Sequence, residues 1–287
     1  SVLGNDAQRF MEQFGCTDTG NWEEGLNVLH RANIPGGSFS RERGLLLAAR
    51  QKRVRPATDD KILTAWNGLM ISALNDAWQT FGENARMKTA RHAAGIYLDR
   101  LRGTGWKLWR VTGNEKNGPP AFLDDYVFLA AAFADLYQST FEEQWLDGAV
   151  RLTRRALEHF QDKDGIFFRL IPDDVPRLVT EPVELSDNVI PASNSVMAHN
   201  LLTLGTIIGE ERWVEQSGRM LAAMALKMRA NPDFHAQWAR LSLRSGDRLI
   251  HIAISGPDPA EVRKAFFGHY MPGVVWSSTT MPGKPLN

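Results

Sequence analysis

A regular pattern of apolar and polar positions dominates the stretch that begins at Ala57. Apolar side chains recur there at steps of three and four residues, which places them on one face of a helix: Ile62, Trp66, Leu69, Met70, Ala73, Leu74 and Ala77. Asp59 and Asp60 precede this stripe, where the unpaired N–H groups of a helix start favour negative charge. The pattern therefore predicts a helix over residues 60–81, with polar groups gathered at its N-terminal end.

The same plan occurs twice more along the chain. A nearly all-apolar helix is predicted from Asp124–Asp125 to about residue 139, and another from Ser193–Asn194 through residue 208. A second, amphipathic helix follows each of the three, over about residues 84–101, 142–160 and 211–229. Because the starts recur at an interval of about 65 to 70 residues, the repeating unit is one helical hairpin with its connecting loop.

An all-apolar helix followed by a one-sided amphipathic helix indicates an inner and an outer layer. Repeated hairpins of this kind form an α/α solenoid, or an α/α toroid where the ring closes. Every inner helix then starts at the same end of the array, so the polar residues at the three starts should surround one opening. Short strands, Trp106–Val111 and Ile166–Ile171, are predicted in the loops after the first two hairpins.

The two ends of the chain depart from the repeat. Short helices are predicted within residues 1–14 and 41–52. Near the C-terminus, a strand over Arg248–Ser255, a helix capped by Asp258 and a strand over Val274–Trp276 predict a small α/β appendage. We therefore expect a mainly α protein with an α/α toroid fragment over residues 1–245 and a strand–helix–strand appendage over 246–287.

Composition narrows the class of protein. Lys and Arg together number 33 and so do Asp and Glu, so no basic field for nucleic acid or an anionic membrane is expected. No apolar run approaches the length of a membrane span, and no signal peptide is visible. Cys16 is the one cysteine, which excludes a disulfide within the chain and favours a cytoplasmic location. The chain opens on Ser1 without a methionine, so we expect a fragment of a longer protein.

The paired acids at the helix starts have two interpretations. A carboxylate at a helix start is ordinarily a cap, which stabilises the helix by about 1 kcal/mol. Neighbouring carboxylates around a closed opening would instead raise one another's pKa and could act as acid and base. A helix cap needs only one acid, whereas the first two predicted helix starts carry two each, Asp59–Asp60 and Asp124–Asp125. The extra acid at each start favours the second interpretation. No Asp-rich loop with the spacing of metal ligands occurs, so neither a metal nor another cofactor is expected.

The candidate catalytic residues are Asp60, Asp125 and His199. His199 follows Asn194 by five residues, where it is either a core histidine bonded to a carbonyl or a base facing a sugar. Asn67 and Gly68 are poor helix formers, so their place within a helix needs a reason. Either a neighbouring helix packs closely on Gly68, or the amide of Asn67 reaches into the opening. The candidate substrate-binding residues are His30, Asp59, Trp66, Asn67, Asp124, Tyr126, Ser193 and Asn194.

Four segments together resemble a known family: GNWEEGLNVLH, RVRPATDDKILTAWNGLMI, FLDDYVFL and DNVIPASNSVMAHNLL. They are similar to the C-terminal region of the spermatogenesis-associated protein 20-like, thioredoxin-domain-containing family, from about Gly15 to Leu202. The resemblance implies an N-terminal thioredoxin-like domain in the longer protein. It also implies an (α/α)6 toroid similar to six-hairpin glycosidases and N-acylglucosamine 2-epimerases, here as an incomplete ring.

Two functions follow from these observations. The first is a carbohydrate ligand bound or processed at the N-terminal ends of the inner helices; a hydrolase would need two carboxyl groups about 5–9.5 Å apart. The second is a non-catalytic scaffold or binding module for the thioredoxin-like domain. An incomplete ring would leave apolar faces of inner helices exposed, which predicts a homodimer through the gap or poor solubility.

Overall fold

The computed structural model describes residues 2–31, 38–112, 118–176, 180–245 and 249–279. The chain divides into two compact units, Ser1–Asp60 and Lys61–Asn287. The first unit holds the helices α1 (Ala7–Gln13) and α2 (Ser40–Gln51), with short 3-10 turns at Gly4–Asp6 and Glu23–Gly25. Phe10, Phe14 and Phe39 pack their rings together there. The two short helices predicted from the sequence are confirmed.

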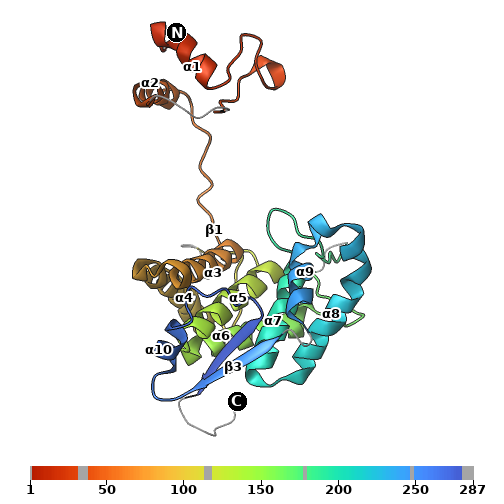
Figure 1. The fold of residues 1–287 in the computed structure, drawn as a ribbon. Coiled ribbons are helices and arrows are strands. Elements are labelled where there is room, and N and C mark those ends of the chain that lie inside the picture. The colour runs from red at the N-terminus through yellow and green to blue at the C-terminus, as the bar shows by residue number, and fades with distance from the viewer. Residues whose placement is uncertain (1, 32–37, 113–117, 177–179, 246–248, 280–287) are drawn as a thin grey trace. The chain divides into compact units, whose positions relative to one another are not determined.

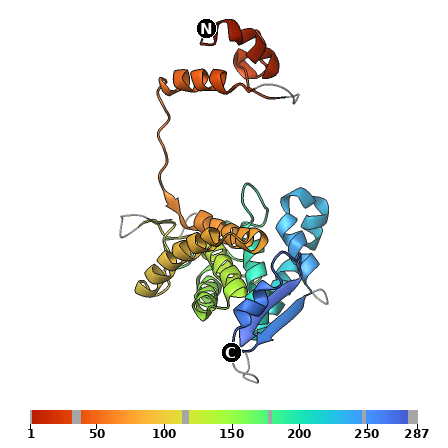
Figure 2. The same ribbon diagram turned by 60° about the vertical axis from the view of Figure 1, so that its left-hand side comes forward.

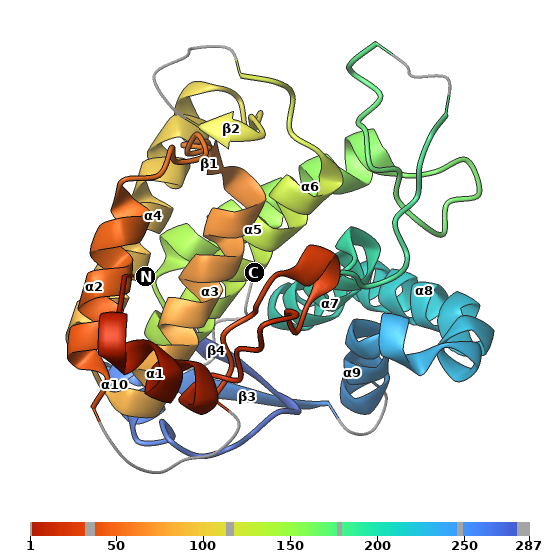
Figure 3. The same ribbon diagram turned by 90° about the horizontal axis from the view of Figure 1, so that it is seen from above.

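The second unit is built from three helical hairpins (Figure 1). They are α3 (Thr64–Phe81) with α4 (Asn84–Gly103), α5 (Leu123–Thr140) with α6 (Glu143–Phe160), and α7 (Ser193–Ile208) with α8 (Glu211–Ala230). Helix α5 packs against both α3 and α7, and each second helix packs against the first helix of its own hairpin. Figure 3 shows α3, α5 and α7 in this order. The predicted mainly α fold, an arc of an α/α toroid, is confirmed.

Burial separates the two layers as the sequence pattern predicts. Nearly all of α5 is buried, including residues on every side of the helix. Helix α6 buries one face only, with Trp145, Leu152 and Phe160 against the core. Each inner helix ends on a residue in the left-handed conformation, Gly82, Phe141 and Gly209, and its N–H closes the last turn. The three hairpins thus share one kind of turn.

Gly68 allows α3 and α5 to approach closely. A Cβ atom at this position would lie 2.7 Å from the carbonyl carbon of Phe128 and 2.8 Å from the amide nitrogen of Leu129. These are backbone atoms, so a side chain at position 68 would force the helices apart. The close-packing interpretation of this glycine is confirmed.

The C-terminal part forms a strand–helix–strand motif on the hairpins. A 3-10 turn (η3, Pro232–Phe234) and α9 (Ala236–Arg244) precede β3 (Ile250–Ser255), α10 (Pro259–Lys264) and β4 (Val274–Thr279). The two strands pair in parallel (Figure 2), and β4 packs against α5 and α7. Asp258 caps α10 by accepting a hydrogen bond from the N–H of Glu261 at 3.3 Å. The predicted motif is confirmed, although Arg248 lies outside the described residues.

Three predictions of local structure were wrong. The first inner helix begins at Thr64 rather than at residue 60, because β1 (Ile62–Leu63) pairs antiparallel with β2 (Val111–Thr112) just before it. The strand predicted over residues 106–111 contributes only its last residue to β2. The strand predicted over 166–171 is an irregular loop whose Phe168 forms one isolated bridge with Gln161. The side chains in these loops are apolar because they are buried under the hairpins. An apolar composition alone does not show whether a segment is buried in this way or is paired as a strand.

Helix α9 was not predicted at all. It is nine residues long and buries only Trp238 and Leu241, so its apolar signal is short. Among the described residues, no helix combines the length and the apolar character that crossing a membrane requires. The division at residues 245 and 246 stays a prediction.

Replacing Gly68 with alanine tests the contact between α3 and α5. We expect Gly68→Ala to lower the free energy of unfolding by about 1 to 3 kcal/mol, because backbone atoms of α5 must move. Gly95→Ala in α4 is the matched control, since a Cβ atom there meets nothing within 4 Å. It should raise the stability by about 0.5 to 1 kcal/mol. Urea unfolding measures both, and equal effects would contradict the close contact.

Candidate functional site

The N-terminal ends of α3, α5 and α7 meet at one end of the second unit. One carboxylate oxygen of Asp125, in the first turn of α5, accepts a hydrogen bond from the N–H of Ala65 in α3 at 2.9 Å. The starts of α5 and α7 are joined through one loop: Leu123 donates to the carbonyl of Leu170, and Asn194 bonds Phe168. The starts of α3, α5 and α7 are therefore gathered as predicted, but not around the predicted opening. Asp59 and Asp60 belong to the first unit and precede the start of α3 at Thr64, and Asp125, Ser193 and Asn194 are buried.

Asp125 is completely buried and caps two helices at once. Its Oδ1 accepts the bond from Ala65, and its Oδ2 accepts from the N–H of Phe122 at 2.9 Å, just before its own helix. The Nη1 of Arg110 lies 3.2 Å from the same Oδ2. Burial raises the pKa of Asp125 to about 7, and the charge of Asp124 adds to this rise. The two amides and Arg110 act in the opposite direction, since they stabilise the ionised form.

Asp124 shares the guanidinium of Arg110 with its neighbour. The Nη1 of Arg110 donates to both oxygens of Asp124, at 3.0 and 3.2 Å. Only 6% of Asp124 is exposed, and burial raises the pKa of its carboxyl, an effect that Arg110 opposes and Glu184 reinforces. Arg110 also lies over the ring of Phe122, with its guanidinium carbon 4.6 Å from the ring centroid. One arginine thus holds both acids of the pair.

The start of α7 is bonded to the loop before it. Asn194 is fully buried, and its amide forms three hydrogen bonds, two with the backbone of Phe168 and one with the carbonyl of Glu184. The N–H of Ser193 donates to the carboxylate of Glu184 at 3.0 Å, which caps the helix. The Oγ of Ser193 is buried, with no hydrogen-bond partner in the described part of the chain. These contacts hold the loop that connects α6 with α7.

His199 lies away from the acids, in the contact between α7 and α9. Its Nε2 is 3.0 Å from the carbonyl of Gln237, and its Nδ1 is 3.3 Å from the Nη1 of Arg244. The first contact requires a proton on Nε2 and the second an acceptor at Nδ1, so the ring is neutral. Burial, assisted by Arg244, lowers the pKa of His199 to about 3. Tyr126 is also a buried core residue, and its hydroxyl accepts bonds from the N–H of Leu108 and from Arg155.

The remaining candidates lie on α3 or in the first unit. Trp66 is 60% exposed, and the amide of Asn67 donates to the carbonyl of Leu63 at 2.8 Å. His30, Asp59 and Asp60 belong to the first unit and are exposed there. The Nδ1 of His30 lies 3.4 Å from the carbonyl of Val28.

Arg110 and Glu184 are the residues that sequence analysis missed. Arg110 lies in the segment interpreted as a strand, Trp106–Val111, which also contains Lys107, so its position in the sequence did not distinguish it. Nothing in the sequence marked Glu184, because its role depends on the fold of an irregular loop. Within the described residues, no group of three or more His, Cys, Asp or Glu side chains is placed to hold a metal ion.

Fold and site together define an α/α-hairpin protein in which an arginine-bound acid pair joins the starts of its first two inner helices. No protein-family model matches the chain. Spermatogenesis-associated protein 20 of Rattus norvegicus is 30% identical over 77% of this chain and 29% of its own length. The human protein of that name is 28% identical over 90% of this chain and 37% of its own length. The family resemblance is confirmed, and the chain spans about a third of these relatives.

Two solved structures share part of the fold. A GH76 α-mannanase of Bacteroides thetaiotaomicron covers 60% of this chain and 47% of its own, at 17% identity and a TM-score of 0.47. Cellobiose 2-epimerase of Bacillus thermoamylovorans covers 58% of this chain and 45% of its own, at 13% identity and a TM-score of 0.46. At these scores the likeness carries no argument about chemistry.

Replacing Asp125 with asparagine tests its capping role. We expect Asp125→Asn to lower the free energy of unfolding by about 2 to 5 kcal/mol, because an amide cannot accept from both helix starts and from Arg110 together. Asp147→Asn is the control: Asp147 forms a comparable pair with Arg151 on the exposed surface of α6, so its loss should cost less than about 1 kcal/mol. Chemical unfolding measures both variants.

The pH dependence of this difference has a definite sign. The pKa of Asp125 is raised from 3.8 to about 7, so the folded chain holds a proton that the unfolded chain releases between these values. Wild type should therefore lose stability relative to Asp125→Asn as pH rises from about 4 to 7, by at most about 1.4 kcal/mol per pH unit. A difference that does not change with pH would contradict the raised pKa.

Proposed function

We propose that this chain is a non-catalytic α/α binding module, in which the acid pair stabilises the array and performs no chemistry. The observation that carries this proposal is the use of Asp125. Its two oxygens accept hydrogen bonds from two helix starts and from Arg110, and no part of the residue is exposed. A general acid or base must come within hydrogen-bond reach of its substrate. Asp125 cannot do so without releasing both helices.

The surface for binding, in this proposal, is the exposed side of α3 and the strand before it. Trp66 and Met70 are 60% and 58% exposed and lie four residues apart on one face of α3, and Ile62 in β1 just before the helix is 50% exposed; we call these three side chains the stripe. On an inner helix of a repeated array, such a stripe is the face that a neighbouring helix would cover. A contiguous exposed apolar face marks an interaction surface. We assign it to a second copy of this chain, and the thioredoxin-like domain implied by the resemblance stays a prediction.

A second function, the binding or processing of a carbohydrate, is favoured by one observation. The pKa values of Asp124 and Asp125 are both raised, so at neutral pH this pair can hold a proton that ordinary carboxyl groups would have lost. Asp124 is the acid that retains some exposure, and Glu184 is close enough to influence its pKa. In this alternative, Asp124 is the proton donor to a sugar and Glu184 the second carboxyl group.

Sedimentation velocity tests the proposed surface. Wild type should form dimers that dissociate on dilution, and Trp66→Glu with Met70→Glu should sediment as a monomer, because charge on the stripe opposes its burial. Leu226→Glu is the matched control, since Leu226 is 80% exposed on α8. It should leave the association unchanged. A monomeric wild type, or dimers that survive the double substitution, would rule out this surface.

A turnover assay separates the two functions. We expect the chain to release no reducing sugar from a panel of oligosaccharides and to epimerise none of them. Turnover that Asp124→Asn abolishes would establish the carbohydrate function instead. Asp124→Asn leaves the two helix-capping bonds of Asp125 in place, so circular dichroism should show an unchanged fold, and loss of activity would then reflect chemistry.

A further inference from the structure

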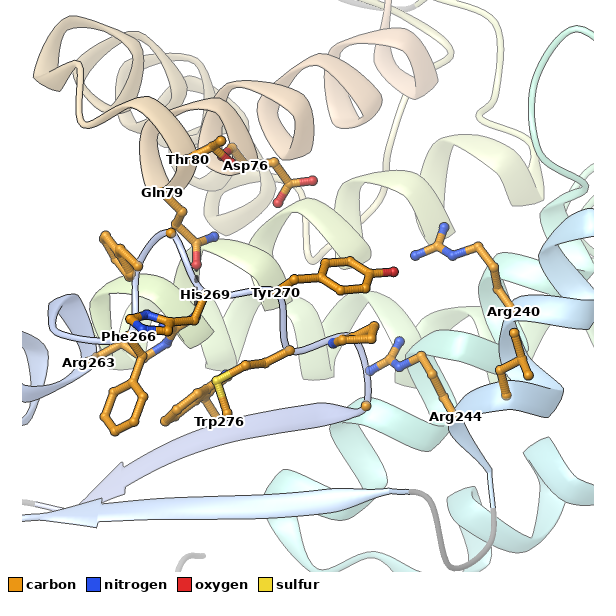
Figure 4. Close-up of a pocket in the computed structure, with 16 residues that line it drawn as sticks. Asp76, Gln79, Thr80, Arg240, Arg244, Arg263, Phe266, His269, Tyr270 and Trp276 are labelled. Atoms are coloured by element: carbon orange, nitrogen blue, oxygen red, sulfur yellow. Dashed lines mark hydrogen bonds between the residues drawn. The ribbon is translucent and has the colours of Figure 1, made fainter.

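A cavity of about 670 Å³ lies between α3, α9 and the C-terminal motif, about three helical turns along α3 from the capped start. Asp76 and Gln79 of α3 form one side, and Arg240 and Arg244 of α9 form the other (Figure 4). The loop before β4 contributes Tyr270. The cavity shares no residue with the candidate site described above.

The two arginines of α9 are four residues apart and therefore lie on one face of the helix. The Nη1 of Arg240 donates to the side chain of Gln237 at 2.9 Å. Arg244 contacts His199 and Thr203, both at 3.3 Å, while its Nε is buried without a hydrogen-bond partner among the described residues. In the part of the chain that the structure describes, neither guanidinium has a carboxylate within 4.0 Å. Arg240 is exposed and Arg244 is partly buried, so both guanidinium groups remain available to an anion that enters the cavity.

The charge around the cavity is positive on balance. Three arginines line it, Arg240, Arg244 and Arg263, against one acid, Asp76. Arg263 is held in place from several sides, since it lies 4.2 Å from the ring centroid of Trp276 and donates to Gln79 and to the carbonyl of Gln138. Asp135 lies behind the wall, where Ser72 donates to its carboxylate at 2.6 Å. Neither acid neutralises the α9 pair by direct contact.

The other lining groups suit a hydroxylated molecule. Tyr270 is 92% exposed, and Figure 4 shows its ring extended across the cavity with its hydroxyl directed towards Arg240. An exposed aromatic ring at the edge of a polar cavity can cover a sugar ring. The carboxylate of Asp76 faces the same space and can accept hydrogen bonds from hydroxyl groups.

We propose that this cavity binds a small phosphorylated polyol or sugar, with Arg240 and Arg244 holding the phosphate group and Tyr270 covering the rest. A phosphate monoester carries about −1.5 to −2 charges at pH 7, which matches the surplus of arginines better than one carboxylate does. The guanidinium forks can donate pairs of hydrogen bonds to its oxygens. The proposal does not depend on the function assigned to the helix starts.

Isothermal titration of the full 287-residue chain tests the proposal. The ligands are inorganic phosphate, glucose 6-phosphate, glucuronate and glucose. Inorganic phosphate and glucose 6-phosphate should bind, the latter more tightly. Glucuronate should bind at least about tenfold more weakly than glucose 6-phosphate, since it carries one charge, and glucose should give no heat. Absence of phosphate binding at millimolar concentration would overturn the proposal, as would glucuronate binding more tightly than both phosphates.

Three variants locate the binding. Arg240→Gln should weaken phosphate binding about tenfold or more, and the exposure of Arg240 makes this change safe for folding. Arg229→Gln, an exposed arginine of α8 outside the cavity, is the matched control and should bind as wild type does. Tyr270→Ala should weaken glucose 6-phosphate but not inorganic phosphate. Equal binding by the Arg240→Gln and Arg229→Gln variants would mean that phosphate binds elsewhere and would refute the site.

Discussion

The structure of the second unit depends on one buried carboxylate. Asp125 joins the start of α3 to the start of α5, and Arg110, from the loop between α4 and α5, joins Asp125 to Asp124. A helix start buried inside an array leaves N–H groups that water cannot reach, so each needs a partner from the protein. One carboxylate between two starts satisfies both. It also keeps neighbouring inner helices in register, because both ends are bonded to the same group.

The same requirement explains why the third start uses different residues. At α7, the amide of Asn194 is bonded to the backbone of the preceding loop, and Glu184 caps Ser193 from that loop. An amide both donates and accepts, so it can pair with the N–H and the carbonyl of Phe168 together, which a carboxylate cannot. The choice of Asp at α5 and Asn at α7 therefore follows from what faces each helix start. A carboxylate can accept from an N–H group that has no other partner, whereas an amide can pair with both the N–H and the carbonyl of one residue.

Much of this fold could be predicted from the sequence, and the reasons are physical. The all-apolar α5 and the one-sided α6 differ in periodicity, and this difference alone assigns them to an inner and an outer layer. Gly68 within a helix indicated close packing, which the backbone of α5 explains. The short strands were harder to predict, since β1 and β2 pair over two residues each. Pairing at that length depends on contacts distant in the sequence, and composition does not encode them.

The candidate site was predictable in location but not in detail. The recurrence of polar residues at helix starts led to Asp124, Asp125, Ser193 and Asn194, which the fold gathers at one end. Arg110 and Glu184 come from loops, and no periodic pattern marks a loop residue. His199 shows the opposite case: it lies on the predicted inner helix, yet it faces α9, a helix whose short apolar signal the sequence did not separate from its surroundings. A residue can be assigned to a pocket only when every element around it is known.

The same reasoning applies to Arg240 and Arg244, whose shared cavity exists because α9 and the loop before β4 close against α3. Periodicity therefore identifies the elements that pack, whereas chemistry between elements depends on the loops and short helices that periodicity does not detect.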